Sequence, residues 1–243
     1  SNGGQTITTS TLTLSGGSGG TFNSAEVRQA GVSGTQNISA SHIHIEGGDG
    51  GSSNYAEIRQ SGASGTQSII SDQIEIQGGS GGSASNPNSA DIRNAGTGGQ
   101  TITIGPDGQL LIQGGSGAGA FARVQNTATA GLQHIAFTSG GSLDIYGGDA
   151  ASGAFARLQT TSTAAGAGDQ TIDGRPAITL FAGANGTADD GNQAQLLATG
   201  VQTISAGATV LQAGLDGYSN SATITSPDQN INILGNLQLL GGG

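Results

Sequence analysis

The chain has 243 residues, of which 47 are glycine, and it contains no cysteine, methionine or tryptophan. Six arginines and no lysine stand against 16 acidic residues, so the formal net charge is −10 at pH 7. This charge disfavours nucleic acid and anionic lipid surfaces as partners, and the lack of cysteine excludes disulfides and thiolate metal sites. No apolar run approaches the roughly 18 residues of a membrane span, so we expect no membrane insertion.

A Gln-x-Ile element recurs along the whole chain. Its glutamines are Gln5, Gln36, Gln67, Gln100, Gln133, Gln170, Gln202 and Gln229. Side chains two residues apart in an extended chain point the same way, so each glutamine shares a strand face with its isoleucine. Self-similarity at a period of roughly 20 to 50 residues is typical of solenoids, whose units bury their apolar faces against neighbouring copies.

Each unit contains three alternating segments in a fixed order. The A segment reads Ala-x-Val/Ile/Leu, as at 25–27 and 56–58; the B segment is Gln-x-Ile; and the C segment reads apolar-x-apolar before a glycine pair, as at 43–45. Units of 28 to 36 residues end near Gly17, Gly48, Gly79, Gly115, Gly148, Gly183, Gly214 and Gly242. Three strands per unit, all connected in one sense, predict one all-β domain over 1–243, a right-handed three-sided parallel β-helix of about 7.5 rungs.

The glutamine column should lie inside this stack. A buried amide without a partner costs roughly 1 to 3 kcal/mol, but amides stacked at the strand spacing can each donate to one neighbour and accept from the other. We predict a continuous internal amide ladder. The alternative is that the glutamines lie at corners and bond to turn backbone.

Outward positions of the A segments form two columns. One contains Glu26, Glu57, Asp91, Arg123 and Arg157, and its neighbour contains Arg28, Arg59, Arg93, Gln125 and Gln159. We expect solvated pairing of opposite charges on this face. It therefore supplies no predicted catalytic residue.

Two smaller clusters are candidates for a metal site and for a contact patch. His42, His44 and Glu46 alternate on one C segment with Glu75 expected beside them on the next rung, which is the best arrangement for a metal ion that the chain offers. Because nothing on other rungs repeats it, we predict neither a metal nor a cofactor. The aromatic residues Phe121, Tyr146, Phe155 and Phe181 are expected on the outside, as stacked rings or as a lateral contact patch.

Both ends of the predicted stack look uncapped. Residues 1–25 and 229–243 contain no charged residue, whereas soluble solenoids normally protect their terminal strand edges. The opening half-rung also lacks an A strand. We predict an end-to-end interface and an axial homopolymer, formed by Ile7, Leu12, Leu14, Ile231, Ile233, Leu237 and Leu239.

Units such as Ala-Glu-Ile-Arg-Gln at 56–60, Gly-Thr-Gln-Ser-Ile at 65–69 and Ile-Glu-Ile-Gln-Gly-Gly-Ser-Gly-Gly at 74–82 carry a resemblance. They resemble the glycine-rich β-solenoid repeats of bacterial surface proteins similar to filamentous haemagglutinin. The resemblance implies an extracellular or cell-surface location, a role in adhesion or matrix, and surface or matrix polysaccharide as a further partner. It implies no catalytic residue.

These observations lead to three functional hypotheses. The first is a non-enzymatic extracellular subunit that stacks end to end into a filament or biofilm-matrix fibre. The second is the shaft or binding segment of a large secreted adhesin. The third is a polysaccharide-active β-helix enzyme.

Overall fold

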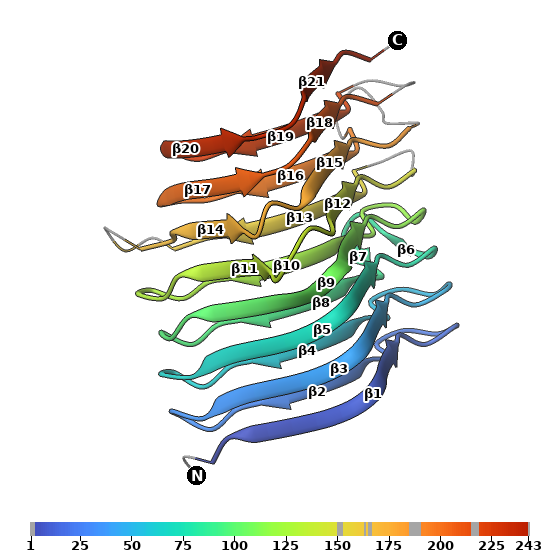
Figure 1. Cartoon of the computed structure of the whole chain (residues 1–243). Coiled ribbons are helices and arrows are strands. Elements are labelled where there is room, and N and C mark those ends of the chain that lie inside the picture. The colour runs from blue at the N-terminus through green and yellow to red at the C-terminus, as the bar shows by residue number, and fades with distance from the viewer. Residues whose placement is uncertain are drawn as a thin grey trace.

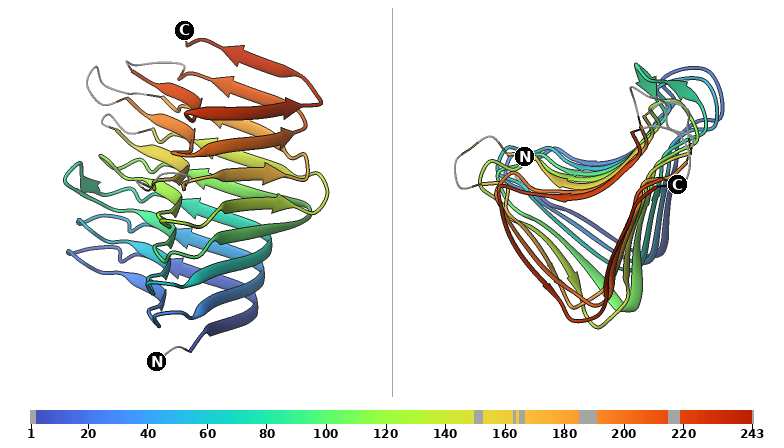
Figure 2. Two further views of the ribbon diagram at one scale, coloured as in Figure 1. Left: turned by 90° about the vertical axis from the view of Figure 1, so that its left-hand side faces the viewer. Right: turned by 90° about the horizontal axis from the view of Figure 1, so that it is seen from above.

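The computed structural model describes residues 3–149, 153–162, 164, 167–184, 191–214 and 219–242, and all regular elements in these ranges are β-strands. The strands wind as a right-handed parallel β-solenoid of about seven turns (Figure 1), which confirms the predicted fold. Seen along its axis, the solenoid has a triangular cross-section (Figure 2). The A, B and C segments each form one side.

The A side is a seven-stranded parallel sheet. Its strands are β2 (Ala25–Gln29), β4 (Ala56–Gln60), β8 (Ala90–Asn94), β10 (Ala122–Asn126), β13 (Phe155–Thr160), β16 (Gln193–Leu197) and β19 (Ser221–Thr225). We number the rungs from β2, so that β2 belongs to rung one and β19 to rung seven.

The B and C sides belong to one larger sheet. Rungs zero to three each supply a single long strand, namely β1 (Gln5–Ser15), β3 (Thr35–Glu46), β5 (Thr66–Gln77) and β9 (Gln100–Gln113). Later rungs supply two strands each: β11 (Gln133–Phe137) and β12 (Ser142–Tyr146), β14 (Gln170–Asp173) and β15 (Ala177–Phe181), β17 (Val201–Ala206) and β18 (Thr209–Gln212), β20 (Asp228–Ile233) and β21 (Leu237–Leu240).

The long bent strands correct the expectation of separate B and C segments in every rung. In rungs four and five the corner residues Gly140, Gly141, Gly174 and Arg175 have positive φ, which takes the chain out of the extended region and ends the strand. Pro106 lies within β9 where the pairing of β9 with β5 is interrupted after Ser71, so its missing N–H costs no ladder bond.

One long C-to-A turn carries structure of its own. Its strands β6 (Gly82–Ser83) and β7 (Asn86–Pro87) form an antiparallel hairpin that projects from the solenoid in rung two (Figure 1). Pro87 is the second residue of the two-residue strand β7.

The core consists of vertical files of like side chains. Ile69 pairs in register with Ile102, and Ile102 with Ile135, and all three are fully buried. Alanines at the start of the A strands form a parallel file, as Ala56 with Ala90. Burying each isoleucine stabilises the fold by about 1.5 to 3 kcal/mol, which suits a thin core that has no room for a large central cavity.

The glycine pairs have a steric reason. A Cβ built on Gly115 would collide with the carbonyl oxygen of Gly79, and one on Gly148 would collide with that of Gly115. Successive rungs therefore approach too closely at this corner for any side chain. Glycine is therefore required at this corner in the rungs that end in Gly-Gly.

Candidate functional site

A continuous amide ladder runs through the interior at the A–B corner. Each glutamine Nε2 donates to the Oε1 of the glutamine one rung earlier, at 2.6 to 3.0 Å over seven bonds from Gln36→Gln5 to Gln229→Gln202. From Gln36 to Gln202 these glutamines are buried. The ladder expected from the sequence is thus present.

The same amides also bond to backbone. Gln67 Nε2 donates to the carbonyl of Arg93 at 3.2 Å, and Gln100 Nε2 donates to that of Gln125 at 3.3 Å. The alternative expectation was correct in that the glutamines bond to backbone. It was wrong about the acceptors, which belong to the A strands and not to turns. Both N–H groups of each of these amides are used, which removes the cost of burying them.

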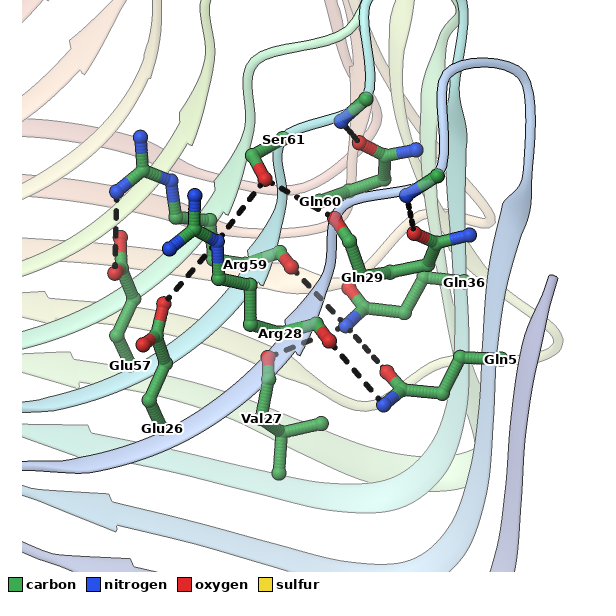
Figure 3. Close-up of polar contacts among 12 residues, drawn as sticks. Gln5, Glu26, Val27, Arg28, Gln29, Gln36, Glu57, Arg59, Gln60 and Ser61 are labelled. Carbon is green, nitrogen blue, oxygen red and sulfur yellow. Dashed lines mark hydrogen bonds and ion pairs between the residues drawn. The ribbon is translucent and has the colours of Figure 1, made fainter. Parts of the chain in front are cut away.

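The ladder has a direction, and it is open at both ends. Among the described groups, Gln5 Nε2 donates to the carbonyl of Arg28 alone, at 3.4 Å (Figure 3). At the other end, no described group donates to Gln229 Oε1, although Gln229 Nε2 is bonded to Gln202. Rung zero therefore offers an amide N–H donor from Gln5, and rung seven offers an amide oxygen acceptor from Gln229.

An asparagine column just before the A strands went unpredicted. Asn54 and Asn88 are fully buried, and the backbone N–H of Asn54 donates to Asn88 Oδ1 at 2.8 Å. The Nδ2 of Asn88 donates to the carbonyl of Gly48 at 2.9 Å, which holds the C-to-A turn. Its signal in the sequence is Asn-x-Ala at 23–25, 54–56, 88–90, 192–194 and 220–222.

A second unpredicted column closes the A-to-B turns. Gln60 Oε1 accepts from the N–H of Gly62 at 2.6 Å, and Gln60 Nε2 donates to the carbonyl of Gly34 at 2.8 Å. Gln29 makes the equivalent contact with the N–H of Gly31 in the rung before (Figure 3). These side chains end the A strand by forming local side chain–backbone hydrogen bonds in place of the hydrogen bonds between strands.

The C-terminal end of the solenoid is open and apolar. Leu239 is 70% exposed, Leu237 54% and Ile231 40%. With Ile233, Leu211 and Ile224 they line a hollow of about 520 Å³ in the last rungs. Exposed apolar surface of this kind is uncommon on soluble monomers.

The N-terminal end differs. Of the residues expected there, Leu14 is buried, and Ile7 and Leu12 are partly buried against the core. The strand edges are nevertheless unpaired, because β1 pairs only with β3 and β2 only with β4. Both ends thus present free backbone, but only the C-terminal end presents a large apolar face.

The A face is less solvated than expected. Glu57 and Asp91 point outward, yet each is only 8% exposed. Seen from above, the A strands bow toward the interior (Figure 2), and this concave shape brings outward side chains together. The expectation of solvated pairing was therefore wrong for the middle of this face.

The charges on the A face pair unevenly. Arg123 binds Asp91 through two bonds, from Nε to Oδ1 at 2.7 Å and from Nη2 to Oδ2 at 2.8 Å. Arg59 Nη1 lies 3.8 Å from Glu57 Oε2, a looser contact that Figure 3 shows beside the pair of Arg28 with Glu26. The bidentate pair is the strongest ionic contact on the face.

Burial affects the acids of this column. Desolvation raises the pKa of the Glu57 carboxyl, and the neighbouring Asp91 raises it further, while Arg59 opposes the shift. Desolvation also raises the pKa of Asp91, although its bonds to Arg123 act in the other direction. Desolvation likewise lowers the pKa of Arg157, with a smaller contribution from Arg123.

The four aromatic side chains form two pairs, as expected. The rings of Phe121 and Phe155 stack with centroids 4.8 Å apart, and those of Tyr146 and Phe181 meet edge to face at 6.5 Å. The guanidinium of Arg157 lies 3.9 Å from the centroid of Phe155. This cation–π contact covers part of the ring surface.

The histidine cluster expected from the sequence forms on the C side. His44 Nδ1 lies 3.0 Å from Glu75 Oε2, His42 Nε2 lies 3.8 Å from the same oxygen, and His44 Nε2 lies 3.6 Å from Glu46 Oε2. Within the described ranges, no three His, Asp or Glu side chains are placed to hold a metal ion. A similar pair, His134 with Asp173 at 2.9 Å on the B face, was not predicted.

Comparisons with known proteins give no relative. No family model, no curated protein and no solved structure matches the chain. A helix long and apolar enough to cross a membrane does not occur among the described residues. The assignment of a role therefore depends on the geometry of the solenoid.

Proposed function

We propose that the protein is a non-enzymatic, extracellular structural subunit that stacks end to end through its terminal rungs. The observation that carries this proposal is the open apolar face at the C-terminal end, where Leu237, Leu239 and Ile231 are exposed. A soluble solenoid gains free energy when such a face is covered. A second copy supplies a cover with the required strand direction.

Rung zero matches rung seven in residue type. Gln5 and Ile7 on the B side correspond to Gln229 and Ile231, and Leu12 and Leu14 on the C side correspond to Leu237 and Leu239. Within the chain, rungs with this match pair in parallel register, as Gln202 with Gln229. The contact between copies repeats a contact already present between rungs.

The amide ladder sets the direction of stacking. By the direction of the ladder, Gln5 of one copy has an N–H to donate downward to the copy before it, and Gln229 Oε1 of that copy has no described donor. The contact is therefore head to tail. A heterologous contact that does not close by rotation produces an open filament.

Stacking places β1 on β20 and β21, whereas β2 and β19 are the two edge strands of the described A sheet. The B and C sides therefore carry the junction.

The same open edge favours a second candidate, the shaft of a larger surface adhesin. In that case the exposed Leu237 and Leu239 are covered by following rungs of a longer polypeptide. The two candidates differ in what covers the face, a second copy or covalently attached sequence.

The test is assembly of the purified 243-residue chain, followed by negative-stain electron microscopy and sedimentation velocity. We expect filaments from the wild type and monomers from the double variant L237K/L239K, because burying a lysine charge at the junction is costly. Leu132→Lys is the matched control, since Leu132 is 42% exposed in a side turn. It should form filaments.

Two results would count against stacking. One is a wild-type chain that stays monomeric at high concentration, which would favour the adhesin shaft. The other is filament formation by L237K/L239K, which would show that the apolar end is not the junction.

A further inference from the structure

Five of the six arginines of the chain lie on the A sheet. We call this set the arginine stripe; it consists of Arg28, Arg59, Arg93, Arg123 and Arg157, one on each of rungs one to five. Arg28, Arg59 and Arg93 lie directly opposite one another in register, as do Arg123 and Arg157. At about 4.8 Å per strand the stripe is about 19 Å long.

The stripe has more positive charge than its own face neutralises. Its five arginines face three carboxylates, Glu26, Glu57 and Asp91, which leaves +2, whereas the rest of the chain has one arginine against 13 acidic residues. In the described part of the chain, neither Arg93 nor Arg157 has a carboxylate within 4.0 Å. The Nε groups of Arg59, Arg93 and Arg157 are buried and without hydrogen-bond partners.

Stacked like charges with unused donors carry an energetic cost. Directly opposed arginines on neighbouring strands repel each other, and each buried unpaired donor adds a desolvation penalty. Because those Nε atoms are buried, a carboxylate from outside the face can reduce only the repulsion, by pairing with the arginine side chains, all of which are at least partly exposed.

A surface of opposite charge lies on another side of the same molecule. Glu46, Asp49 and Asp149, together with glutamines and serines, line a hollow of about 190 Å³ at the ends of the C strands and in the turns that follow. No arginine lines this acidic hollow. Asp49 and Asp149 are exposed, and Glu46 is partly exposed.

We propose that the arginine stripe of one rod binds the acidic hollow of a second copy, so that rods associate side by side. The stripe occupies rungs one to five, and the hollow extends from Asp49 in rung one to Asp149 in rung four. Two parallel rods at the same height therefore bring the two surfaces level. No axial shift is needed.

The contact repeats from rod to rod. Because the stripe lies on the A strands and the hollow lies at the ends of the C strands and in the turns that follow, each bound pair leaves one stripe and one hollow free. Heterologous contacts of this kind extend without closing. The result is a layer of parallel rods, formed by contacts that do not involve the ends.

The net charge of −10 opposes association at long range. That repulsion is screened beyond about 8 to 10 Å at 0.1 to 0.15 M salt, whereas ion pairs in direct contact are screened less. Side-by-side association should therefore occur at physiological salt. It should be lost near 1 M salt, where the screening length falls to about 3 Å.

A charge-swap experiment tests the proposal. All proteins carry L237K/L239K, the pair of substitutions expected to block end-to-end stacking, so this contact does not contribute. The first variant reverses the stripe with R28E/R157E, and the second reverses the hollow with D49K/D149K. The control is Arg175→Glu, which reverses the one arginine outside the stripe, an exposed residue at the B–C corner.

The readout is sedimentation velocity over a concentration series at about 0.1 M salt. Each reversed variant alone should associate at least about tenfold more weakly than the parent, since one charged hydrogen bond lost from a contact has roughly this effect. An equal mixture of the two variants should associate again, and R175E should match the parent. Equal melting temperatures of all variants verify that they fold.

Three outcomes would overturn the proposal: a parent protein that is monomeric at every concentration, a mixture that does not recover, or an R175E variant as weak as R28E/R157E. Titration with polygalacturonate distinguishes a second copy from an anionic polysaccharide as the partner of the stripe. Tight binding of this polymer by a monomeric parent, lost in R28E/R157E, would assign the stripe to an anionic polysaccharide instead of a second copy.

Discussion

The interior amide column and the exterior ionic column of the A face obey the same repeat but differ in outcome. Inside, Gln67, Gln100 and Gln133 stack and each satisfies the next. Outside, Glu26 and Glu57 stack at the same strand spacing, and burial, followed by repulsion from the neighbouring acids, raises the pKa of Glu57. The difference is that an amide is both donor and acceptor, whereas two carboxylates can only repel.

This difference explains how each column varies along the chain. The glutamine column is unbroken over all eight positions. The ionic column has three acids, changes sign at Arg123 and Arg157, and is neutral at Gln195 and Thr223. A solenoid can repeat a self-complementary side chain indefinitely, but a charged one only for a few rungs.

The largest effect should come from breaking the amide column at its centre. Replacing Gln100 by leucine leaves Gln67 Oε1, an N–H of Gln133 and the carbonyl of Gln125 without their partner. We expect a loss of about 2 to 4 kcal/mol in the free energy of unfolding. Urea denaturation followed by circular dichroism measures it.

Gln73→Leu serves as the control for the amide column, because Gln73 is exposed on the C side. Its stability should change by less than about 0.5 kcal/mol. Equal losses in the two variants would mean that the ladder contributes nothing beyond any other glutamine.

A smaller effect should follow from removing the cation that ends the acidic run. Arg123→Gln leaves the buried Asp91 carboxylate without its bidentate partner, and we expect a loss of about 2 to 3 kcal/mol at pH 7. Arg28→Gln breaks a 3.8 Å contact of a half-exposed side chain and should cost less than about 0.5 kcal/mol. Thermal melts compare the two, and similar losses would contradict the role of burial.

The smallest effect concerns the pH dependence of Glu57. The pKa of Glu57 is higher in the folded state than its ordinary value of 4.5 in the unfolded state. Between these two pKa values the folded protein binds a proton at Glu57 that the unfolded chain does not bind, so lowering the pH through this range favours folding. The penalty for ionised Glu57 is therefore fully present at neutral pH and disappears in acid. Glu57→Gln should stabilise the protein at pH 7 by less than about 1 kcal/mol.

Denaturation of wild type and Glu57→Gln at a series of pH values measures this difference. The advantage of the variant should shrink between pH 7 and pH 4.5. An advantage that grows on acidification would show that the carboxylate stabilises the fold. Glu26→Gln, at the edge of the same column, is the matched control and should have a smaller effect at pH 7.

Much of the interior could be predicted because it depends only on which residues repeat. Gln100 and Ile102 recur at every rung two residues apart, so both had to face the same side and meet their own copies. The asparagines at 54 and 88 belong to an Asn-x-Ala signal that precedes five of the seven A segments and was not recognised. The surface offered no such rule, and the solvation of Glu57 and Asp91 was predicted wrongly.

By itself the sequence determined the vertical files, since period-two alternation and a constant repeat assign each side chain to a face and to a partner one rung away. Only the tertiary structure decided how deeply Glu57 and Asp91 are buried, which way the amide ladder points, and where the strands bend continuously around the B–C corner. These properties depend on the curvature of a sheet and on distances between sides of the triangle. Neither is encoded in the spacing of residues along one strand.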